Sequence, residues 1–138
     1  MNRNRVAALG VGVLGVLLVG LTVPLWAHHS TTMFVMDKQT VLEGTITEVA
    51  WGNPHSVLFI DAKPSDQPNA AVKNWSIEAP SPRRLSTMGW NKETVKAGDK
   101  VKITGFARKH GKTQILFIEL SDEQGHKFGM KRSDYVAD

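Results

Sequence analysis

Three histidines have the spacing to bind one metal ion together. His28 and His29 directly follow Ala27, which closes an uncharged apolar run. Cleavage after Ala27 would make His28 the first residue of the mature chain. Its α-amine and ring nitrogen could then chelate a metal, and a nitrogen from another histidine would complete a T-shaped set, as in the copper sites called histidine braces. Amine and imidazole donors suit Cu(II), which heads the affinity order of divalent ions. The sequence therefore predicts a copper site that depends on where the chain is cut.

The third nitrogen of this site is expected from His55, with His29 as a further donor through its ring or its amide. His55 follows Asn53-Pro54 in a predicted turn, and a proline-restricted turn loses little conformational entropy when its side chain is used. Met33 and Met36 carry thioethers that suit Cu(I), or else they pin the amino-terminal segment to the domain. The alternative for His28 and His29 is an exposed amino terminus without a ligand.

A second set of residues predicts ligand binding without a metal. Trp51 precedes the Asn-Pro-His turn, Trp75 lies in a predicted strand, and Trp90 follows the predicted helix. Exposed tryptophans on such a domain stack sugars, bases or apolar molecules, whereas buried ones pack the core. Arg84, beside Arg83, is positioned to hold an anionic group, or to form a salt bridge with Glu78.

The sequence gives no indication of an enzyme. It lacks Gly-x-Ser-x-Gly, a phosphate-binding loop, His-Glu-x-x-His and any cysteine, which excludes disulfides and thiolate metal sites. A copper redox enzyme would need an open coordination position and a route for a reductant, and the spacing of residues indicates neither. We therefore expect a carrier, an accessory factor, or a module that binds a small molecule or a protein.

An export signal is expected at residues 1–27. The first five residues include two basic ones, Arg3 and Arg5, and residues 6–27 carry no charge, as in a secretory signal peptide. The predicted location is the periplasm, with membrane contact only through this segment before cleavage; a retained anchor is the alternative, since about 20 apolar residues span a bilayer. Removing Arg3 and Arg5 leaves 15 of 17 basic residues against 13 acidic ones, a net charge of +2. This balance does not favour nucleic-acid binding.

The mature chain is predicted to be a small all-β domain. An extended leader (28–40) precedes the domain (41–128), and a flexible tail (129–138) follows it. Alternating and β-branched segments predict strands at 41–51, 56–62, 72–79, 100–109 and 113–120, with a further short hairpin at 122–128. Ser81 and Pro82 predict the start of a short helix that Gly89 ends. Five strands with a helix between the third and the fourth predict an OB-like Greek-key barrel.

Several of these motifs together resemble a family of small exported proteobacterial proteins known as a domain of unknown function. The most specific are the "AHHS" start at residues 27–30 and the "WGNPH" turn at residues 51–55; Trp75, Glu78, Gly89-Trp90, Gly98-Asp99 and Gly105 accompany them. The resemblance implies export, and it implies that His28, His29 and His55 belong to the family pattern. It implies no activity. The chain differs at residues 31–33, where relatives usually carry Phe and Ala, so the resemblance does not extend to Met33 as a ligand.

Overall fold

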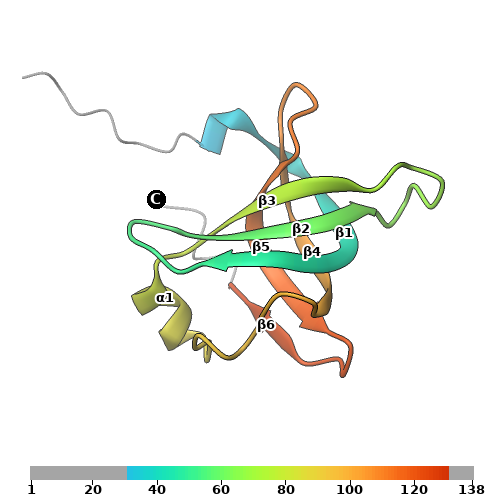
Figure 1. The fold of residues 1–138 in the computed structure, drawn as a ribbon. Helices are drawn as coiled ribbons and strands as arrows, with labels where there is room; N and C mark the ends of the chain where they lie inside the picture. Colours follow the sequence, from blue (N-terminus) through green and yellow to red (C-terminus); the bar gives the residue numbers. More distant parts are fainter. Residues whose placement is uncertain (1–30, 131–138) are drawn as a thin grey trace, which may run out of the picture.

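The computed structural model describes residues 31–130 of the chain. Its elements are a 3-10 turn η1 (Thr31–Met33), strands β1 (Phe34–Ala50), β2 (Ser56–Pro64) and β3 (Lys73–Ala79), helix α1 (Pro82–Thr87), and strands β4 (Lys100–Arg108), β5 (Gln114–Asp122) and β6 (Lys127–Gly129) (Figure 1). The predicted signal peptide, His28, His29 and residues 131–138 of the predicted tail lie outside the described residues.

The strands close into a ring of five. Antiparallel pairing joins β1 to β2 and β4, β2 to β3, and β4 to β5, while residues 76–78 of β3 pair in parallel with residues 114–116 of β5. The ring order is therefore β1-β2-β3-β5-β4, and β6 adds antiparallel to β5. This closure satisfies backbone groups that an open sheet would leave at its edges. The predicted OB-like arrangement, with one short helix between the third and fourth strands, is confirmed.

The first strand begins earlier than the sequence predicts. β1 starts at Phe34 rather than at Val41, so much of the predicted leader is strand that pairs with the far end of β4. Its register is irregular between Phe34, opposite Arg108, and Gln39, opposite Phe106. Residues 36–39 are all exposed, so this part shows no alternation of apolar and polar residues. Backbone pairing with β4, which a hydrophobic pattern does not report, extends the strand here.

Helix α1 is bounded as predicted. Ser81 is its N-cap and accepts a hydrogen bond from the Arg84 backbone N–H at 3.4 Å, Pro82 is its first residue, and Gly89 follows it with φ of +87°. Leu85 is buried and anchors the helix to the core. Within residues 31–130 no helix has the length and apolar character to cross a membrane.

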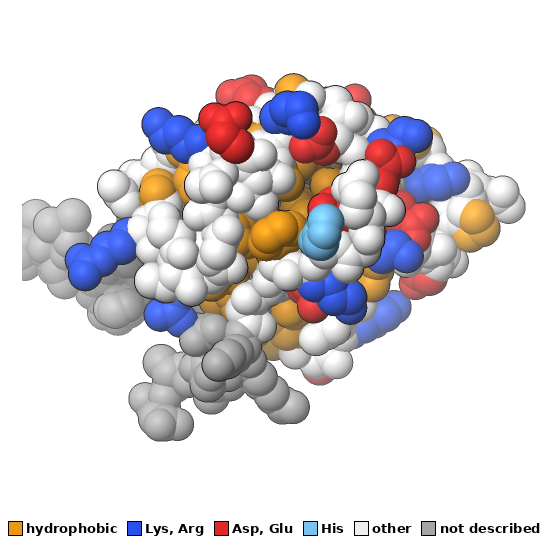
Figure 2. Space-filling view, turned by 90° about the horizontal axis from the view of Figure 1, so that it is seen from below, with side chains coloured by type: hydrophobic (Ala, Val, Ile, Leu, Met, Phe, Trp, Pro, Cys, Tyr) orange, Lys and Arg blue, Asp and Glu red, His pale blue; other side chains and the backbone are white. Residues whose placement is uncertain are grey.

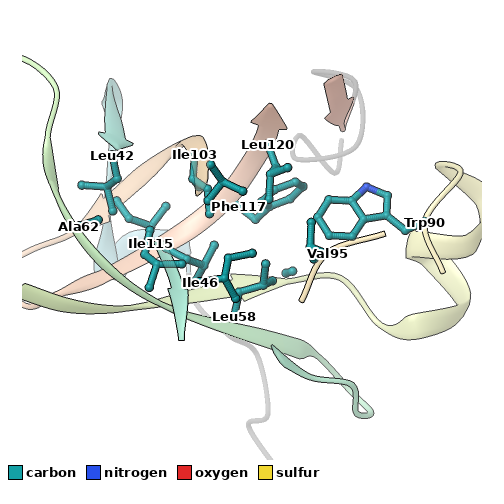
Figure 3. Close-up of a cluster of buried hydrophobic side chains, with 14 of the residues drawn as sticks. Leu42, Ile46, Leu58, Ala62, Trp90, Val95, Ile103, Ile115, Phe117 and Leu120 are labelled. Carbon is teal, nitrogen blue, oxygen red and sulfur yellow. The ribbon is translucent and has the colours of Figure 1, made fainter. Parts of the chain in front are cut away.

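A single hydrophobic core fills the ring (Figure 3). Inward-facing aliphatic side chains from all five ring strands meet there, and Phe117 of β5 lies among them. Trp90, which follows α1, packs edge-on against Phe117 and Phe128, with ring centroids 5.6 and 5.5 Å apart. Trp90 is 3% exposed, so it seals the core at the α1 side and presents no stacking surface to a ligand.

Charges of both signs are mixed on the outside of the domain. Figure 2 shows one face on which basic and acidic side chains are interspersed around a strip of hydrophobic ones. Charged side chains of the domain surface also pair across neighbouring strands, as Lys102 does with Glu43 at 2.8 Å and Lys127 with Glu119 at 3.1 Å. Such exposed pairs contribute little each, so the core and not the surface charge accounts for the stability of the ring.

Candidate functional site

A cavity of about 400 Å³ lies where the amino-terminal segment, the β1–β2 loop and the start of α1 meet. Most of its wall is apolar, and Phe34, Leu116 and Phe117 contribute to it. Three ionisable side chains line it as well: His55, Glu78 and Arg84. The volume is within the range typical of sites for small ligands, and an apolar wall with a few convergent polar groups is their usual chemistry.

His55 is held at the cavity by the entry into β2. The next residue, Ser56, is buried, pairs with Ala79 of β3, and donates its backbone N–H to the Pro80 carbonyl at 3.1 Å. Pro54 restricts the chain on the other side. The His55 side chain is 34% exposed, and its Nε2 lies 3.8 Å from Oε1 of Glu78. The imidazole is therefore fixed at its base and reachable from solvent.

Glu78 is the least exposed of the three ionisable side chains that line the cavity. Its side chain is only 12% exposed. Its Oε2 accepts a hydrogen bond of 3.2 Å from Nε2 of Gln114, and the side-chain amide oxygen of Gln114 accepts one from the Arg108 guanidinium. A carboxylate with so little solvent needs such donors, because burying an unpaired charge is costly.

The amino-terminal segment reaches the same cavity. Thr31, the first described residue, lines it together with His55. Phe34 is 7% exposed and anchors the start of β1 at the cavity wall. The Met33 carbonyl accepts the Lys109 backbone N–H at 3.0 Å, and the Arg108 guanidinium lies 3.7 Å from the Met33 sulfur. The end of β4 thus holds the segment in place.

The structure separates the tryptophans from the arginine with which they were expected to form a ligand site. Arg84 lines the cavity, but no tryptophan is among the described residues of its wall. Trp51 and Trp75 are half-buried and pack against the core, and Trp75 donates its indole N–H to the Ala62 carbonyl at 3.2 Å. Trp75 lines a different cavity, beside Pro64 and Ala107. The exposed large hydrophobic residues of the described part are instead Met33, Met36 and Val72.

Donors for a metal are incomplete within the described part of the chain. Among residues 31–130 no group of three His, Cys, Asp or Glu side chains is placed to hold a metal ion. His55 is at the cavity, while His110 and His126 are exposed in the β4–β5 and β5–β6 turns. The predicted copper site therefore requires His28 or His29, which lie outside the described residues.

Two polar residues of this region, Glu78 and Gln114, were not predicted as site residues. Gln114 has no chemistry that a motif would reveal, and Glu78 was expected only as a partner of Arg84. The available signal was weak: Glu78 is an acidic residue between Ile77 and Ala79, which are both buried. Its contact with Gln114 depends on the parallel pairing of β3 with β5, which joins strands far apart in sequence.

The fold and the cavity define a small OB-like domain with a ligand-sized cavity at the amino-terminal side of its strand ring. The chain belongs to a family of unknown function, DUF6152, which it matches over residues 16–117. The resemblance expected from the sequence is thereby confirmed, and the matched segment contains His28, His29, His55 and Glu78. No curated protein and no solved structure matches the chain.

Proposed function

We propose that this protein is exported to the periplasm and binds copper there, as a carrier or accessory factor. The α-amine and ring of His28, exposed by cleavage after Ala27, and the ring of His55 form the site, and His29 adds a further nitrogen. These donors match the preference of Cu(II) for amine and imidazole nitrogen.

The observation that supports the proposal is that Thr31 and His55 line one cavity. An extended chain spans at most about 3.6 Å per residue, so the α-carbon of His28 is within about 11 Å of that of Thr31. Thr31, the described residue nearest to His28 in the chain, and His55 are therefore on the same side of the domain. Had β1 begun on the opposite side of the ring from the β1–β2 loop, the proposal would have failed on geometry alone.

The surroundings of His55 suit a cation. Metal ions bind the neutral form of imidazole, and the Glu78 carboxylate 3.8 Å from the ring adds a negative charge that offsets the nearby Arg84. The apolar walls limit solvent around the ring, which strengthens these charge interactions.

The experiment uses the mature protein made by export, so that its amino terminus is native. Intact mass gives the first residue, and titration with Cu(II) is followed by electron paramagnetic resonance. We expect a mass that begins at His28 and one nitrogen-rich copper site, which His28→Ala abolishes and His55→Ala weakens. His126→Ala is the matched control, because this exposed histidine pairs with Asp122 in the β5–β6 turn, and it should leave the site unchanged. An added amino-terminal methionine should abolish tight binding.

A mature chain with another first residue, or weak copper binding that His55→Ala does not alter, would overturn the proposal. The protein would then be a metal-free module for a small molecule or a protein, as Trp51, Trp75 and Arg84 first suggested. Binding of such a ligand would survive His28→Ala.

A further inference from the structure

Glu78 stands between His55 and a row of polar side chains that crosses the outside of the ring. Each member comes from a different element: His55 from the β1–β2 loop, Glu78 from β3, Gln114 from β5 and Arg108 from β4. The role inferred here for Glu78 rests on the copper site proposed above. We infer that Glu78 is the positioning carboxylate of that site, which orients the His55 ring for the metal, and that Gln114 and Arg108 hold Glu78 in place.

The direction of each hydrogen bond in this row is fixed by chemistry. A guanidinium has only donors, so Gln114 must turn its amide oxygen toward Arg108 and its NH₂ group toward Glu78. The observed contacts follow this order, with Nε2 of Gln114 3.2 Å from Oε2 of Glu78. The amide therefore presents a donor to one carboxylate oxygen of Glu78, and the other carboxylate oxygen faces Nε2 of His55.

A surface salt bridge would not require this arrangement. Exposed ion pairs form between long side chains in solvent and contribute little to stability. Lys102 and Glu43 form such a pair, and the side chain of each is about half exposed. Glu78 is 12% exposed and has a fixed amide behind it. Such support is typical of a carboxylate whose orientation matters to its neighbour. In metal sites, a carboxylate beside one ring nitrogen of a histidine fixes the tautomer and raises the basicity of the other nitrogen, which binds the metal.

The same row also reaches the amino-terminal segment. The second guanidinium nitrogen of Arg108 lies 3.7 Å from the Met33 sulfur, and the neighbouring Lys109 N–H binds the Met33 carbonyl. Arg108 thus contacts the segment that leads to His28, while Gln114 and Glu78 connect it to His55. One network thereby connects His55 with the start of the described part of the chain at Met33.

The test compares Glu78→Gln with Glu43→Gln in the exported, mature protein. Both variants remove one negative charge, but Glu43 belongs to the exposed pair with Lys102. Copper affinity is measured by competition with a chelator of known Kd, together with the electron paramagnetic resonance spectrum. We expect Glu78→Gln to raise Kd by roughly 10- to 100-fold, as loss of an outer-shell partner does, and Glu43→Gln to leave it unchanged. Glu78→Asp, which keeps the carboxylate, should restore part of the affinity.

A second readout needs no metal. Nitrogen-15 spectra of the histidine rings in the copper-free protein report which nitrogen of His55 carries the proton. We expect the proton on Nε2, facing Glu78, and a changed tautomer balance in Glu78→Gln and in Gln114→Met. Gln114→Met keeps the carboxylate and so decides the question if Glu78→Gln does not fold.

The outcomes separate the two proposals. If copper binding depends on His28 and His55 but Glu78→Gln alters neither Kd nor the tautomer, the role of Glu78 is wrong and the copper site stands. If the wild-type protein has no such copper site, the proposed function fails, and the positioning of a metal ligand by Glu78 fails with it. A tautomer change that then persists would show only that Glu78 orients His55 for another ligand.

Discussion

Replacing Gly44 by alanine should open the ring between β1 and β2. Gly44 lies opposite Ala62 of β2 and Val101 of β4. A Cβ atom at this position would lie 2.5 Å from the Cβ of Ala62 and would overlap the Asp61 carbonyl oxygen. These obstacles belong to a strand backbone and to a methyl group fixed to it, so no rotamer change relieves them. The strands themselves must move apart.

The expected cost follows from two opposing terms. Overpacking of a tight interior costs about 1–3 kcal/mol, and a backbone obstacle places Gly44→Ala at the upper end of that range. Loss of glycine freedom in the unfolded chain returns about 0.4–1 kcal/mol. The net destabilisation is about 2 kcal/mol, which for a domain of this size lowers Tm by roughly 10 °C.

Gly52→Ala provides the matched control, because the same substitution has space there. Its Cβ would meet only the His55 carbonyl oxygen, at 3.6 Å. We expect Gly52→Ala to be neutral or to stabilise by up to about 1 kcal/mol. Urea unfolding followed by tryptophan fluorescence, to which buried Trp90 contributes, measures both variants. Equal shifts of the two midpoints would refute the argument from strand spacing.

Three further predictions use the same unfolding assay. Leu85→Ala should destabilise the domain by about 2–5 kcal/mol, because Leu85 is 1% exposed. Ser81→Ala should cost only about 0.5–1 kcal/mol, because the hydrogen bond by which Ser81 caps α1 is long, at 3.4 Å. A larger loss of stability for Ser81→Ala than for Leu85→Ala would contradict this ranking. The Lys96 backbone N–H, 2.9 Å from the Asp99 carboxylate, holds the pKa of Asp99 below its usual 3.8, so this stabilisation is present above that value and is lost as the pH falls through the lower folded pKa. The midpoint difference between wild type and Asp99→Asn should therefore be constant from about pH 7 to about pH 5 and should shrink in more acidic solution; a constant difference throughout would be contrary evidence. Phe34→Ala should destabilise the domain by about 3 kcal/mol. It should also weaken the proposed copper binding, because Phe34 anchors the amino-terminal segment at the cavity; an unchanged copper affinity would show that this anchor does not contribute to the proposed site.

The sequence by itself determined the local elements of the domain. Alternation of apolar and polar residues located the five ring strands, since side chains of a strand point to opposite faces. Ser81, Pro82 and Gly89 marked the ends of α1, because capping and φ preferences act over a few residues. The order of strands and helix then sufficed for the OB-like prediction. The predicted donor His55 was placed by the proline turn that precedes it.

Only the tertiary structure decided which of these residues meet. The early start of β1 depends on pairing with β4, and the burial of Trp90 depends on its contacts with Phe117 and Phe128. The contact between Glu78 and Gln114 requires β3 and β5 to pair in parallel, in one particular register. In a hairpin the turn fixes the register, but β3 and β5 are separated by residues 80–113, so no turn joins them and reports that they pair. The approach of Thr31 to His55, on which the proposed copper site depends, arises in the same way from ring closure.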